Sequence, residues 1–466
     1  MKEGILMYNI YLKDLLNLCN AKLIKGNLDT VLDNFSKDTR TINENDIYVG
    51  IKGENFDGSI FYQEAFNKGA KGCILNNSTE IDEAYIDALD NKFVVLVDDT
   101  VFCLQQLAKY KRSLCHIPVI GVTGSVGKTS TKDIIASVLS KKYKVLKTIG
   151  NYNNHIGLPL TILSLKDEEA MVLEMGMNNL GEISTLSKIA KPTLGVITNV
   201  GTSHIGNLGS RENILKAKLE ILDGMDKKML VINNDNDLLH QYYLKNINNT
   251  ELNFITFGIN NDSLYQAKNI IQNHTESTYN CLINDFNYQI DVLVPGEHFV
   301  LNSLCALAVG KVFDVAITDI LSGIKDFELT KKRMEIIKND QYVIINDCYN
   351  ANYDSMKAAL DYLGTLKNRK VAVLGDMLEL GEYSKFLHES LADVIINNHI
   401  DLVICVGKEM QYLKNKLSEK VLVKHYDNNI EAIKYLKNNL LKDDNILIKA
   451  SNGMHFTEIL EAINES

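Results

Sequence analysis

Residues 121–130 read GVTGSVGKTS, and this stretch decides the fold. It follows an apolar strand signal and precedes a run with Ile134 and Val138 on one helical face, so it predicts a strand, a glycine-rich turn and a helix. Glycines let backbone N–H groups close around phosphate oxygens, and the N-terminus of the following helix attracts the same anion. The lysine can reach the outer phosphates, and the threonine hydroxyl can bind Mg²⁺. The predicted phosphate-binding residues are Thr123, Gly124, Ser125, Gly127, Lys128, Thr129 and Ser130.

The loop departs from the generic phosphate-binding pattern at one position. Val122 stands where that pattern has its first glycine, and Gly124 supplies the flexibility instead. A kinase, a GTPase or a motor ATPase could carry such a loop, and an ordinary strand–turn–helix with a chance Gly-Lys-Thr is the simplest alternative. The segments that follow are needed to choose between these interpretations.

Length and composition describe an acidic protein with several domains. At roughly 150 residues per domain, 466 residues predict about three domains. The net charge of -10 argues against a nucleic-acid partner bound through a basic surface. Eight scattered cysteines, without Cys-x-x-Cys pairs or zinc spacing, fit a reducing compartment. We expect a cytoplasmic protein with no signal peptide in residues 1–20 and no membrane span.

Strand and helix signals alternate along most of the chain, which predicts an α/β fold of three domains. Residues 1–102 predict a small α/β domain, and residues 103–316 predict a central parallel sheet with crossover helices. Within the latter, residues 252–294 suggest a small antiparallel appendage. Residues 317–466 predict a second, Rossmann-like open sheet. Strands are expected at 117–122, 170–173, 194–198, 229–232, 343–346, 371–374, 402–406 and 446–449, and those at 170–173, 194–198 and 229–232 are expected to be buried.

Two ionisable residues stand at the ends of predicted strands. A carboxylate at the end of a buried strand, as at Glu174, is expensive unless it meets a cation. Ligands bind at the carboxyl ends of parallel strands, so Glu174 is a candidate Mg²⁺ ligand beside Thr129. His204 follows the strand at 194–198. Mg²⁺ prefers oxygen ligands. From the residues alone, His204 is therefore equally compatible with a metal ligand and with an ordinary loop histidine.

The order of these segments resembles the Mur ligase family along nearly the whole chain. The SKDTR run at 36–40 and the YVGIKGENFDG run at 48–58 look like the uridine-nucleotide domain of that family. The other matching segments are the loop at 123–129, KTIGNYNNHIGLP at 147–159, NVGTSH at 199–204, PGEHFVLN at 295–302, KRME at 332–335 and NDCYNAN at 346–352.

This resemblance implies an ATP-dependent ligase that forms an amide bond with the help of Mg²⁺, expected as two ions. It implies catalytic roles for Lys128, Lys218 and His204, and it makes His204 a metal ligand beside Thr129 and Glu174. Lys218 matches a lysine that carries a carbamate in many members, and the carbamate would support the metal site. Neutralising a lysine at pH 7 costs roughly 4–5 kcal/mol, so the modification should depend on the folded site. The further nucleotide contacts implied are Asn302, Arg333 and Asp347.

The resemblance also implies the two substrates. The runs at 349–355 and 374–381 look like the branch that adds D-alanyl-D-alanine to UDP-N-acetylmuramoyl-tripeptide in cell-wall synthesis, although Tyr353 replaces the usual proline and Asn452 a common arginine. We expect a monomer that accepts a tripeptide ending in lysine or diaminopimelate. Another Mur-family or folylpolyglutamate-type ligase, and a regulatory nucleotide-binding module, remain alternatives. The candidate substrate contacts are Arg40, Asn151, Asn153, Asn154, Tyr349, Asn350 and Asn352.

Overall fold

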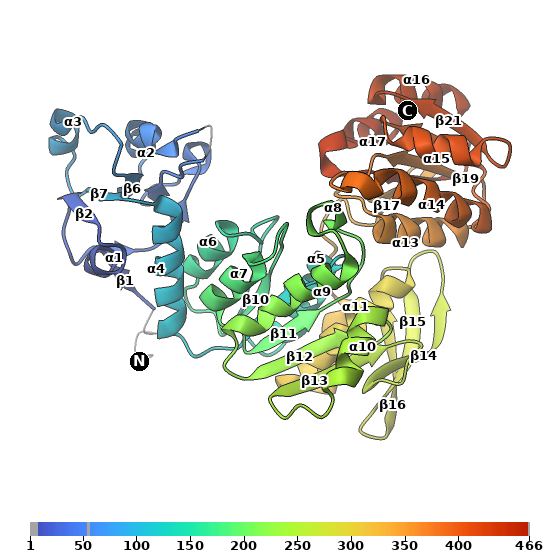
Figure 1. The fold of residues 1–466 in the computed structure, drawn as a ribbon, viewed down its shortest axis with the longest axis horizontal. Coiled ribbons are helices and arrows are strands. Elements are labelled where there is room, and N and C mark those ends of the chain that lie inside the picture. Colours follow the sequence, from blue (N-terminus) through green and yellow to red (C-terminus); the bar gives the residue numbers. More distant parts are fainter. Residues whose placement is uncertain (1–7, 54–55, 465–466) are drawn as a thin grey trace.

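The computed structural model describes residues 8–53 and 56–464, and it confirms the α/β class with three large sheets and one two-stranded pair (Figure 1). Glu54 and Asn55, within the run at 48–58, and residues 1–7 of the segment tested for a signal peptide lie outside the described residues. No helix in the described ranges has the length and apolar character of a membrane span. All eight cysteines are free thiols.

The first sheet has the strand order β2-β7-β6-β5-β4, with β2 antiparallel to β7 and the other strands parallel. A separate antiparallel pair, β1 and β3, lies beside it. The strands are β1 (Ile10–Tyr11), β2 (Lys22–Lys25), β3 (Val31–Leu32), β4 (Phe35–Ser36), β5 (Ile47–Val49), β6 (Gly72–Asn76) and β7 (Phe93–Val97). The helices are α1 (Leu12–Cys19), α2 (Tyr62–Asn67) and α3 (Glu83–Asp87).

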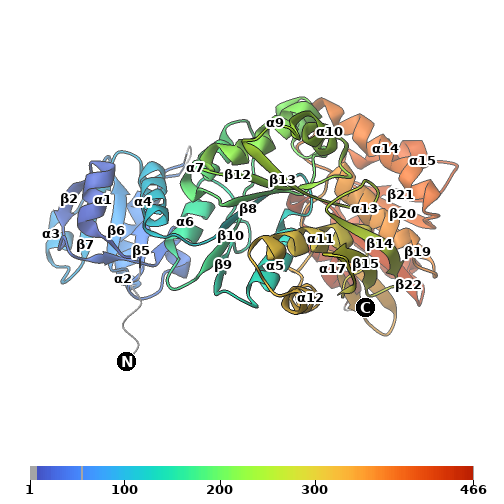
Figure 2. The same ribbon diagram turned by 90° about the horizontal axis from the view of Figure 1, so that it is seen from below.

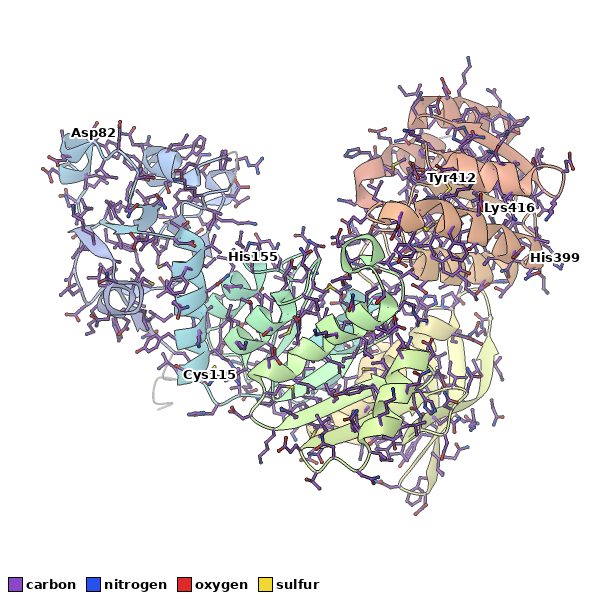
Figure 3. All side chains as sticks on the ribbon, in the orientation of Figure 1. Asp82, Cys115, His155, His399, Tyr412 and Lys416 are labelled. Atoms are coloured by element: carbon purple, nitrogen blue, oxygen red, sulfur yellow. The ribbon has the colours of Figure 1, made fainter. Side chains whose placement is uncertain are left out.

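Helix α4 (Thr100–Leu114) joins the first sheet to the second. Asp99 caps it by accepting hydrogen bonds from the N–H groups of the first turn, as an N-cap aspartate does. Near its C-terminal end the buried Arg112 donates to the carbonyl oxygens of Ala190 and Lys191. Figure 3 labels His155 beside α4 and Cys115 at its C-terminal end. This helix therefore runs across the predicted boundary at residue 102 and packs against α6 (Gly157–Leu163) and α7 (Glu182–Ala190).

The central sheet has nine strands in the order β16-β15-β14-β13-β12-β11-β8-β10-β9. The strands from β9 to β14 are parallel, and β14, β15 and β16 form an antiparallel end. The strands are β8 (Val119–Thr123), β9 (Val145–Lys147), β10 (Ala170–Glu174), β11 (Leu194–Ile197), β12 (Lys228–Asn233), β13 (Leu252–Gly258), β14 (Tyr265–Gln272), β15 (Ser277–Ile283) and β16 (Phe286–Val292). The expected antiparallel appendage thus begins at β14, because β13 pairs parallel with β12.

Helices cover both faces of the central sheet (Figure 2). Helix α5 packs against α11 and α12, whereas α4 packs against α6 and α7. Gly323 and Gly310 allow the close approach to α5, since a Cβ at Gly323 would lie 2.6 Å from the Cα of Val138. The helices are α5 (Lys128–Leu139), α6 (Gly157–Leu163), α7 (Glu182–Ala190), α8 (Ile205–Leu208), α9 (Arg211–Leu219), α10 (Asp237–Asn246), α11 (Glu297–Val312) and α12 (Ile317–Lys325).

The C-terminal sheet has the order β17-β18-β22-β19-β20-β21, and only β17 is antiparallel to its neighbour. This is the open, parallel arrangement expected from the alternating strand and helix signals. The strands are β17 (Glu335–Lys338), β18 (Tyr342–Asn346), β19 (Lys370–Gly375), β20 (Leu402–Val406), β21 (Leu422–Tyr426) and β22 (Asp444–Lys449). The helices are α13 (Tyr353–Gly364), α14 (Ser384–Asn397), α15 (Met410–Leu417), α16 (Asn429–Asn439) and α17 (Thr457–Asn464).

The glycine contact between α12 and α5 gives a stability prediction. We expect Gly323→Ala to lower the free energy of unfolding by about 1–3 kcal/mol, because the added methyl overlaps the backbone of Val138. Thr318→Ala, on the exposed face of α12, should change it by less than about 0.5 kcal/mol. Calorimetric unfolding of both variants checks this, and equal melting temperatures would contradict the close packing.

Candidate active site

A cleft with a cavity volume of about 610 Å³ lies between the carboxyl ends of the central strands and the C-terminal sheet. The central sheet contributes Lys128 and Glu174 to its lining, and the C-terminal part of the chain contributes Arg333 and Asp347. The cleft thus gathers residues from segments that are far apart in the sequence. Other predicted residues in its lining are Ser125, Gly127, Thr129, Ser130, Asn151, Asn153, Asn154, His204, Asn302, Tyr349, Asn350 and Asn352.

The phosphate loop turns sharply between β8 and α5. Gly124 has a φ of 155°, and a Cβ there would lie 1.8 Å from the Oγ1 of Thr198, so a larger residue does not fit. Asn199 Oδ1 accepts the N–H groups of Ser125 and Val126, at 3.1 and 2.9 Å. Those two amides are therefore held inside the protein. The unpaired N–H groups of the first turn of α5 remain for an anion, as at other helix N-termini.

Lys128 is folded back over the loop, where its Nζ donates to the carbonyl oxygen of Gly124 at 2.9 Å. Burial lowers the pKa of Lys128, and the nearby Arg333 lowers it further, whereas Glu174 opposes the shift. Two cationic side chains and one carboxylate thus share this part of the cleft. Such a surplus of positive charge suits a polyanionic ligand.

Glu174 joins three predicted segments at one point. It ends β10, is 2% exposed, and accepts the Thr129 hydroxyl on Oε2 and the Asn153 amide on Oε1, each at 2.8 Å. No three His, Cys, Asp or Glu residues of the described chain gather as a metal cluster. A hydroxyl and a carboxylate nevertheless suit Mg²⁺, which commonly takes one or two protein oxygens and completes its shell with phosphates and water.

Lys218 lies on α9, whose N-terminus Ser210 caps by accepting the N–H of Asn213. Its side chain is 1% exposed and does not line the cleft. Among the residues that the structure describes, its amine has no hydrogen-bond or ion-pair partner. Burial lowers the pKa of Lys218 well below its ordinary value, and the neighbouring Lys128 lowers it further. Burial therefore disfavours the charged form of this amine.

His204 faces the C-terminal sheet. Its backbone is left-handed, with a φ of 62°, at the start of α8, and its Nδ1 lies 2.9 Å from Glu379 Oε2. This close contact with His204 lowers the pKa of Glu379, although the Nδ1 geometry does not meet that of a hydrogen bond. Next to it, Ser203 donates to the Ser125 carbonyl oxygen and accepts the side-chain amide of Asn352. The segment at 199–204 therefore links the phosphate loop to the C-terminal sheet.

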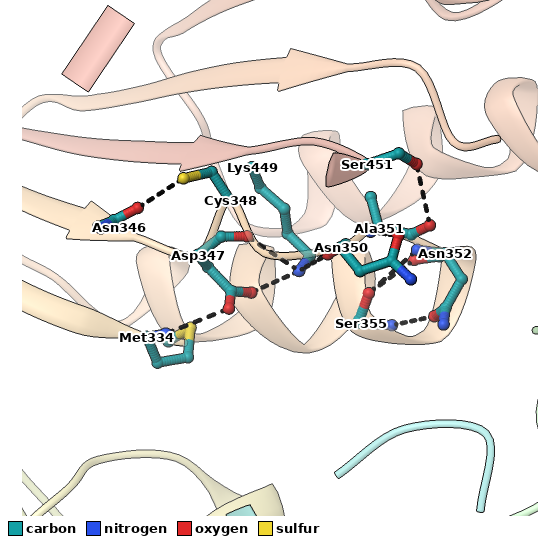
Figure 4. Close-up of polar contacts among 10 residues, drawn as sticks. All are labelled: Met334, Asn346, Asp347, Cys348, Asn350, Ala351, Asn352, Ser355, Lys449 and Ser451. Atoms are coloured by element: carbon teal, nitrogen blue, oxygen red, sulfur yellow. Dashed lines mark hydrogen bonds and ion pairs between the residues drawn. The ribbon is translucent and has the colours of Figure 1, made fainter. Parts of the chain in front are cut away.

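A buried ion pair organises the C-terminal wall of the cleft (Figure 4). Lys449, which is 2% exposed, donates to Asp347 Oδ2 and, at 3.0 Å, to the carbonyl oxygen of Asn350. Asp347 Oδ1 accepts the N–H of Met334 at 3.1 Å. Asp347 thus holds the segment that carries Arg333 into the cleft.

The Arg333 guanidinium stacks on the Tyr349 ring, 4.0 Å from its centroid. Its buried Nε has no hydrogen-bond partner within the described residues.

Asn352 caps α13 by accepting the N–H of Ser355. Tyr353 therefore occupies the first helical position, where proline is common, and the turn keeps its form without it.

Asn302 lies against the phosphate loop from α11. Its Oδ1 accepts the Thr131 hydroxyl at 3.0 Å, and a Cβ on Gly127 would lie 3.1 Å from the same oxygen. His298, one turn earlier on α11, also lines the cleft. Burial lowers the pKa of His298 to about 4, so it is neutral at pH 7.

The loop at 151–155 extends the cleft toward the first sheet. The Asn154 side chain accepts the N–H groups of Ile156 and Gly157, while the exposed Tyr152 ring lies 5.3 Å from Lys37 Nζ. Arg40 is close in sequence to Lys37, but its exposed side chain pairs with Asp38 and lies outside the cleft lining.

Three other predicted residues do not line the cleft either: Thr123, Gly124 and Lys218. Conversely, Asn199 and Lys449 are functional candidates that the sequence prediction omitted. Asn199 stands at a strand end in the 199–204 run, and Lys449 ends a predicted strand. Position at the carboxyl end of a parallel strand was the signal available for both.

Lys218 gives a stability prediction that needs no substrate. The pKa of Lys218 is lower in the folded than in the unfolded chain. The free energy of unfolding should therefore rise with pH between these two pKa values, and the contribution of Lys218 should be most destabilising below them. In bicarbonate-free buffer at pH 7, we expect Lys218→Met to raise the free energy of unfolding by about 1–3 kcal/mol, and the gain should shrink toward pH 10.

Urea unfolding at several pH values measures this effect. Lys216→Met changes an exposed lysine of the same helix and should leave the wild-type pH dependence intact. If Lys218→Met were less stable than the wild type at pH 7, its amine would have to be paired in the folded protein.

Comparison with known proteins identifies the family. The model described as Mur ligase middle domain matches residues 122–310, and the model described as Mur ligase, glutamate ligase domain matches residues 332–452. The chain is 39% identical over 460 residues to the UDP-N-acetylmuramoyl-tripeptide--D-alanyl-D-alanine ligase of Bacillus subtilis (strain 168), which covers 96% of this chain and 97% of that relative.

Two solved structures share the fold over almost the full length. MurF from Acinetobacter baumannii has a TM-score of 0.88 at 26% identity and covers 99% of this chain and 100% of that chain. MurF ligase from Thermotoga maritima in complex with ADP has a TM-score of 0.79 at 29% identity. The match covers 93% of this chain and 97% of that chain. With two family models that span the cleft and a relative at 39% identity over nearly its full length, the chain belongs to the Mur ligase family.

Proposed function

We propose that this protein joins D-alanyl-D-alanine to UDP-N-acetylmuramoyl-tripeptide in an ATP-dependent reaction of peptidoglycan precursor synthesis. It is an ATP-dependent ligase, as its relatives' names and the ADP complex of one relative indicate. One observation of the structure carries the proposal. A single cleft holds a phosphate loop, a buried strand-end carboxylate and a wall rich in amide side chains.

The triphosphate of ATP would lie at the N-terminus of α5. Its first-turn amides and Lys128 would bind phosphate oxygens, and Arg333 would approach from the opposite wall with its unpaired Nε–H. Asn302, beside Gly127, would contact the adenosine, and Asp347 would hold Arg333 in place through the Met334 backbone.

Thr129 and Glu174 would hold Mg²⁺ together with the phosphates. When bound, Mg²⁺ neutralises charge on the transferring phosphoryl group. His204 and a carbamate on Lys218 are our candidates for support of a second ion. Nδ1 of His204 is already paired with Glu379, so only its other nitrogen is free for that role.

The reaction would start at the carboxylate that ends the tripeptide. A carboxylate oxygen attacks the γ-phosphorus of ATP, and the bond between that phosphorus and the β,γ-bridging oxygen breaks. The products are an acyl phosphate and ADP. Lys128 and Arg333 stabilise the negative charge that develops between these two anions. The dipeptide amine then attacks the acyl carbon and releases a proton to solvent, and the tetrahedral intermediate expels phosphate.

The C-terminal wall suits a small dipeptide. Its amides, on Asn350 and Asn452, match peptide donors and acceptors, and Ala351 and Ala358 leave room for two methyl groups. The UDP-sugar would reach the cleft along the loop at 151–155. The first sheet would then hold the uridine end, with Arg40 available on its surface. We propose that the predicted domains at 1–102, 103–316 and 317–466 divide the substrates in this way.

Burial of Lys218 supports the proposed carbamate. Burial disfavours the charged amine and lowers the pKa of Lys218, and the reaction with CO₂ requires the neutral amine. A carbamate would add two acceptor oxygens behind the phosphate loop. It would also place a negative charge next to Lys128, which would favour the charged form of that lysine.

Phosphate release tests the proposed reaction. With ATP and Mg²⁺, we expect release only when both D-alanyl-D-alanine and UDP-N-acetylmuramoyl-tripeptide are present, with the lysine and diaminopimelate forms offered separately. Folate with glutamate is the control for the polyglutamate alternative. Release that depends on folate and glutamate would contradict the proposal, and release without any acceptor would favour a nucleotide-binding module.

Glu174→Gln tests the strand-end carboxylate. Removing its charge should lower kcat by roughly 10²–10³-fold, because the metal ion that neutralises the phosphoryl group loses a ligand. Glu182→Gln changes another carboxylate in the cleft lining, which accepts the Asn178 N–H, and should stay near the wild-type rate. Equal losses in both variants would argue against a special role for Glu174.

Lys218→Ala tests the carbamate. We expect the turnover of this variant to be strongly reduced. The wild type should show a carbamate signal in ¹³C NMR after incubation with ¹³C-bicarbonate. That signal should persist in Lys216→Ala and disappear in Lys218→Ala. Wild-type turnover in Lys218→Ala would remove the carbamate from the mechanism.

A further inference from the structure

The loop at 376–381, which follows β19, is held by side chains outside it. The N–H of Met377 donates to His388 Nε2 at 3.1 Å, and the N–H of Leu378 donates to Ser451 Oγ at 3.0 Å. Two consecutive amides of the loop are therefore fixed by side chains from α14 and from the segment after β22. This backbone cannot move without breaking one of these bonds.

The protonation of His388 follows from its contacts. Its Nε2 accepts a hydrogen bond, so the neutral ring carries its proton on Nδ1, which donates to the Ser384 carbonyl oxygen at 2.8 Å. The Ser384 hydroxyl donates to Glu409 Oε2, so it does not compete for that role. His388 is fully buried, and burial lowers its pKa, which favours this neutral form.

The fixed loop shapes the cleft through Leu378. This side chain is 45% exposed and lines the cleft, whereas its neighbours Met377 and Leu380 are 1% and 2% exposed. A Cβ on Gly453 would lie 3.4 Å from Leu378 Cδ1. The Ser451 hydroxyl that accepts the Leu378 amide also lies 3.5 Å from the carbonyl oxygen of Ala351. Three segments of the C-terminal wall thus meet around one apolar side chain.

We propose that His388 is a positioning residue for the incoming dipeptide: by holding the Met377 amide, it fixes Leu378 as the apolar contact for a small D-amino-acid side chain. This inference rests on the proposed function. A methyl group gains from contact with Leu378, while a branched or aromatic side chain would collide with the fixed wall. His388 itself is buried behind the loop and touches no substrate.

Kinetics of His388 variants test the proposal. His388→Leu should raise the KM for D-alanyl-D-alanine about tenfold, the effect of losing one well-formed hydrogen bond, and leave the KM values for ATP and UDP-N-acetylmuramoyl-tripeptide unchanged. Leu378→Ala should raise the same KM and also improve the use of dipeptides with larger side chains.

Two conservative variants separate positioning from general stability. His388→Gln places an acceptor near the Nε2 position and should restore the KM for the dipeptide to within about twofold of the wild type. His388→Asn places its acceptor near Nδ1 and should behave like His388→Leu. Rescue by Asn as well as Gln, or a parallel change in all three KM values, would overturn the proposal.

Hydrogen exchange of the Met377 amide in the substrate-free protein gives a readout independent of turnover. Exchange should be fast in His388→Leu and His388→Asn and slow in the wild type and His388→Gln. Fast exchange in the wild type would overturn the inference even if the proposed reaction holds. A wild type with slow exchange that ignores D-alanyl-D-alanine would overturn the proposed function, and with it the assigned ligand.

Discussion

A buried carboxylate is the constraint on which the cleft depends. Glu174 ends a central strand with 2% exposure, and its two direct partners are neutral, the Thr129 hydroxyl and the Asn153 amide. A buried carboxylate without a paired cation is unfavourable, so this arrangement is complete only when positive charge joins it. The phosphate loop, β10 and the asparagine-rich loop converge on that carboxylate, and this is the point where the proposed divalent ion would meet the phosphates of the nucleotide.

The segment at 199–204 connects this point to the C-terminal sheet. Asn199 holds two amides of the phosphate loop, Ser203 bonds to the loop and to Asn352, and His204 pairs with Glu379. A change in the phosphate loop therefore acts directly on the wall assigned to the dipeptide. The phosphate loop and the C-terminal sheet are thus in direct contact through the residues of this one segment.

Local signals predicted most of the fold and the central part of the site. Glycines and apolar periodicity placed the loop, its helix and the strands around it, because these features depend on neighbouring residues. The direction of β13 was predicted wrongly, since alternation is the same in parallel and antiparallel strands. Lys449 was omitted because its partner Asp347 is about a hundred residues away, and only the sheet order brings β18 beside β22. Arg40 was chosen as a substrate contact from a short sequence match alone. The structure places its side chain on the surface, where it pairs with Asp38.

A crystal structure with a non-hydrolysable ATP analogue and Mg²⁺ tests the central claim most directly. The account predicts that the outer phosphates lie at the first turn of α5 beside Lys128. An ion bound by the Thr129 hydroxyl and Glu174 should replace the direct hydrogen bond between them. An analogue bound away from this turn, or an intact Thr129–Glu174 hydrogen bond with no ion beside it, would contradict the account.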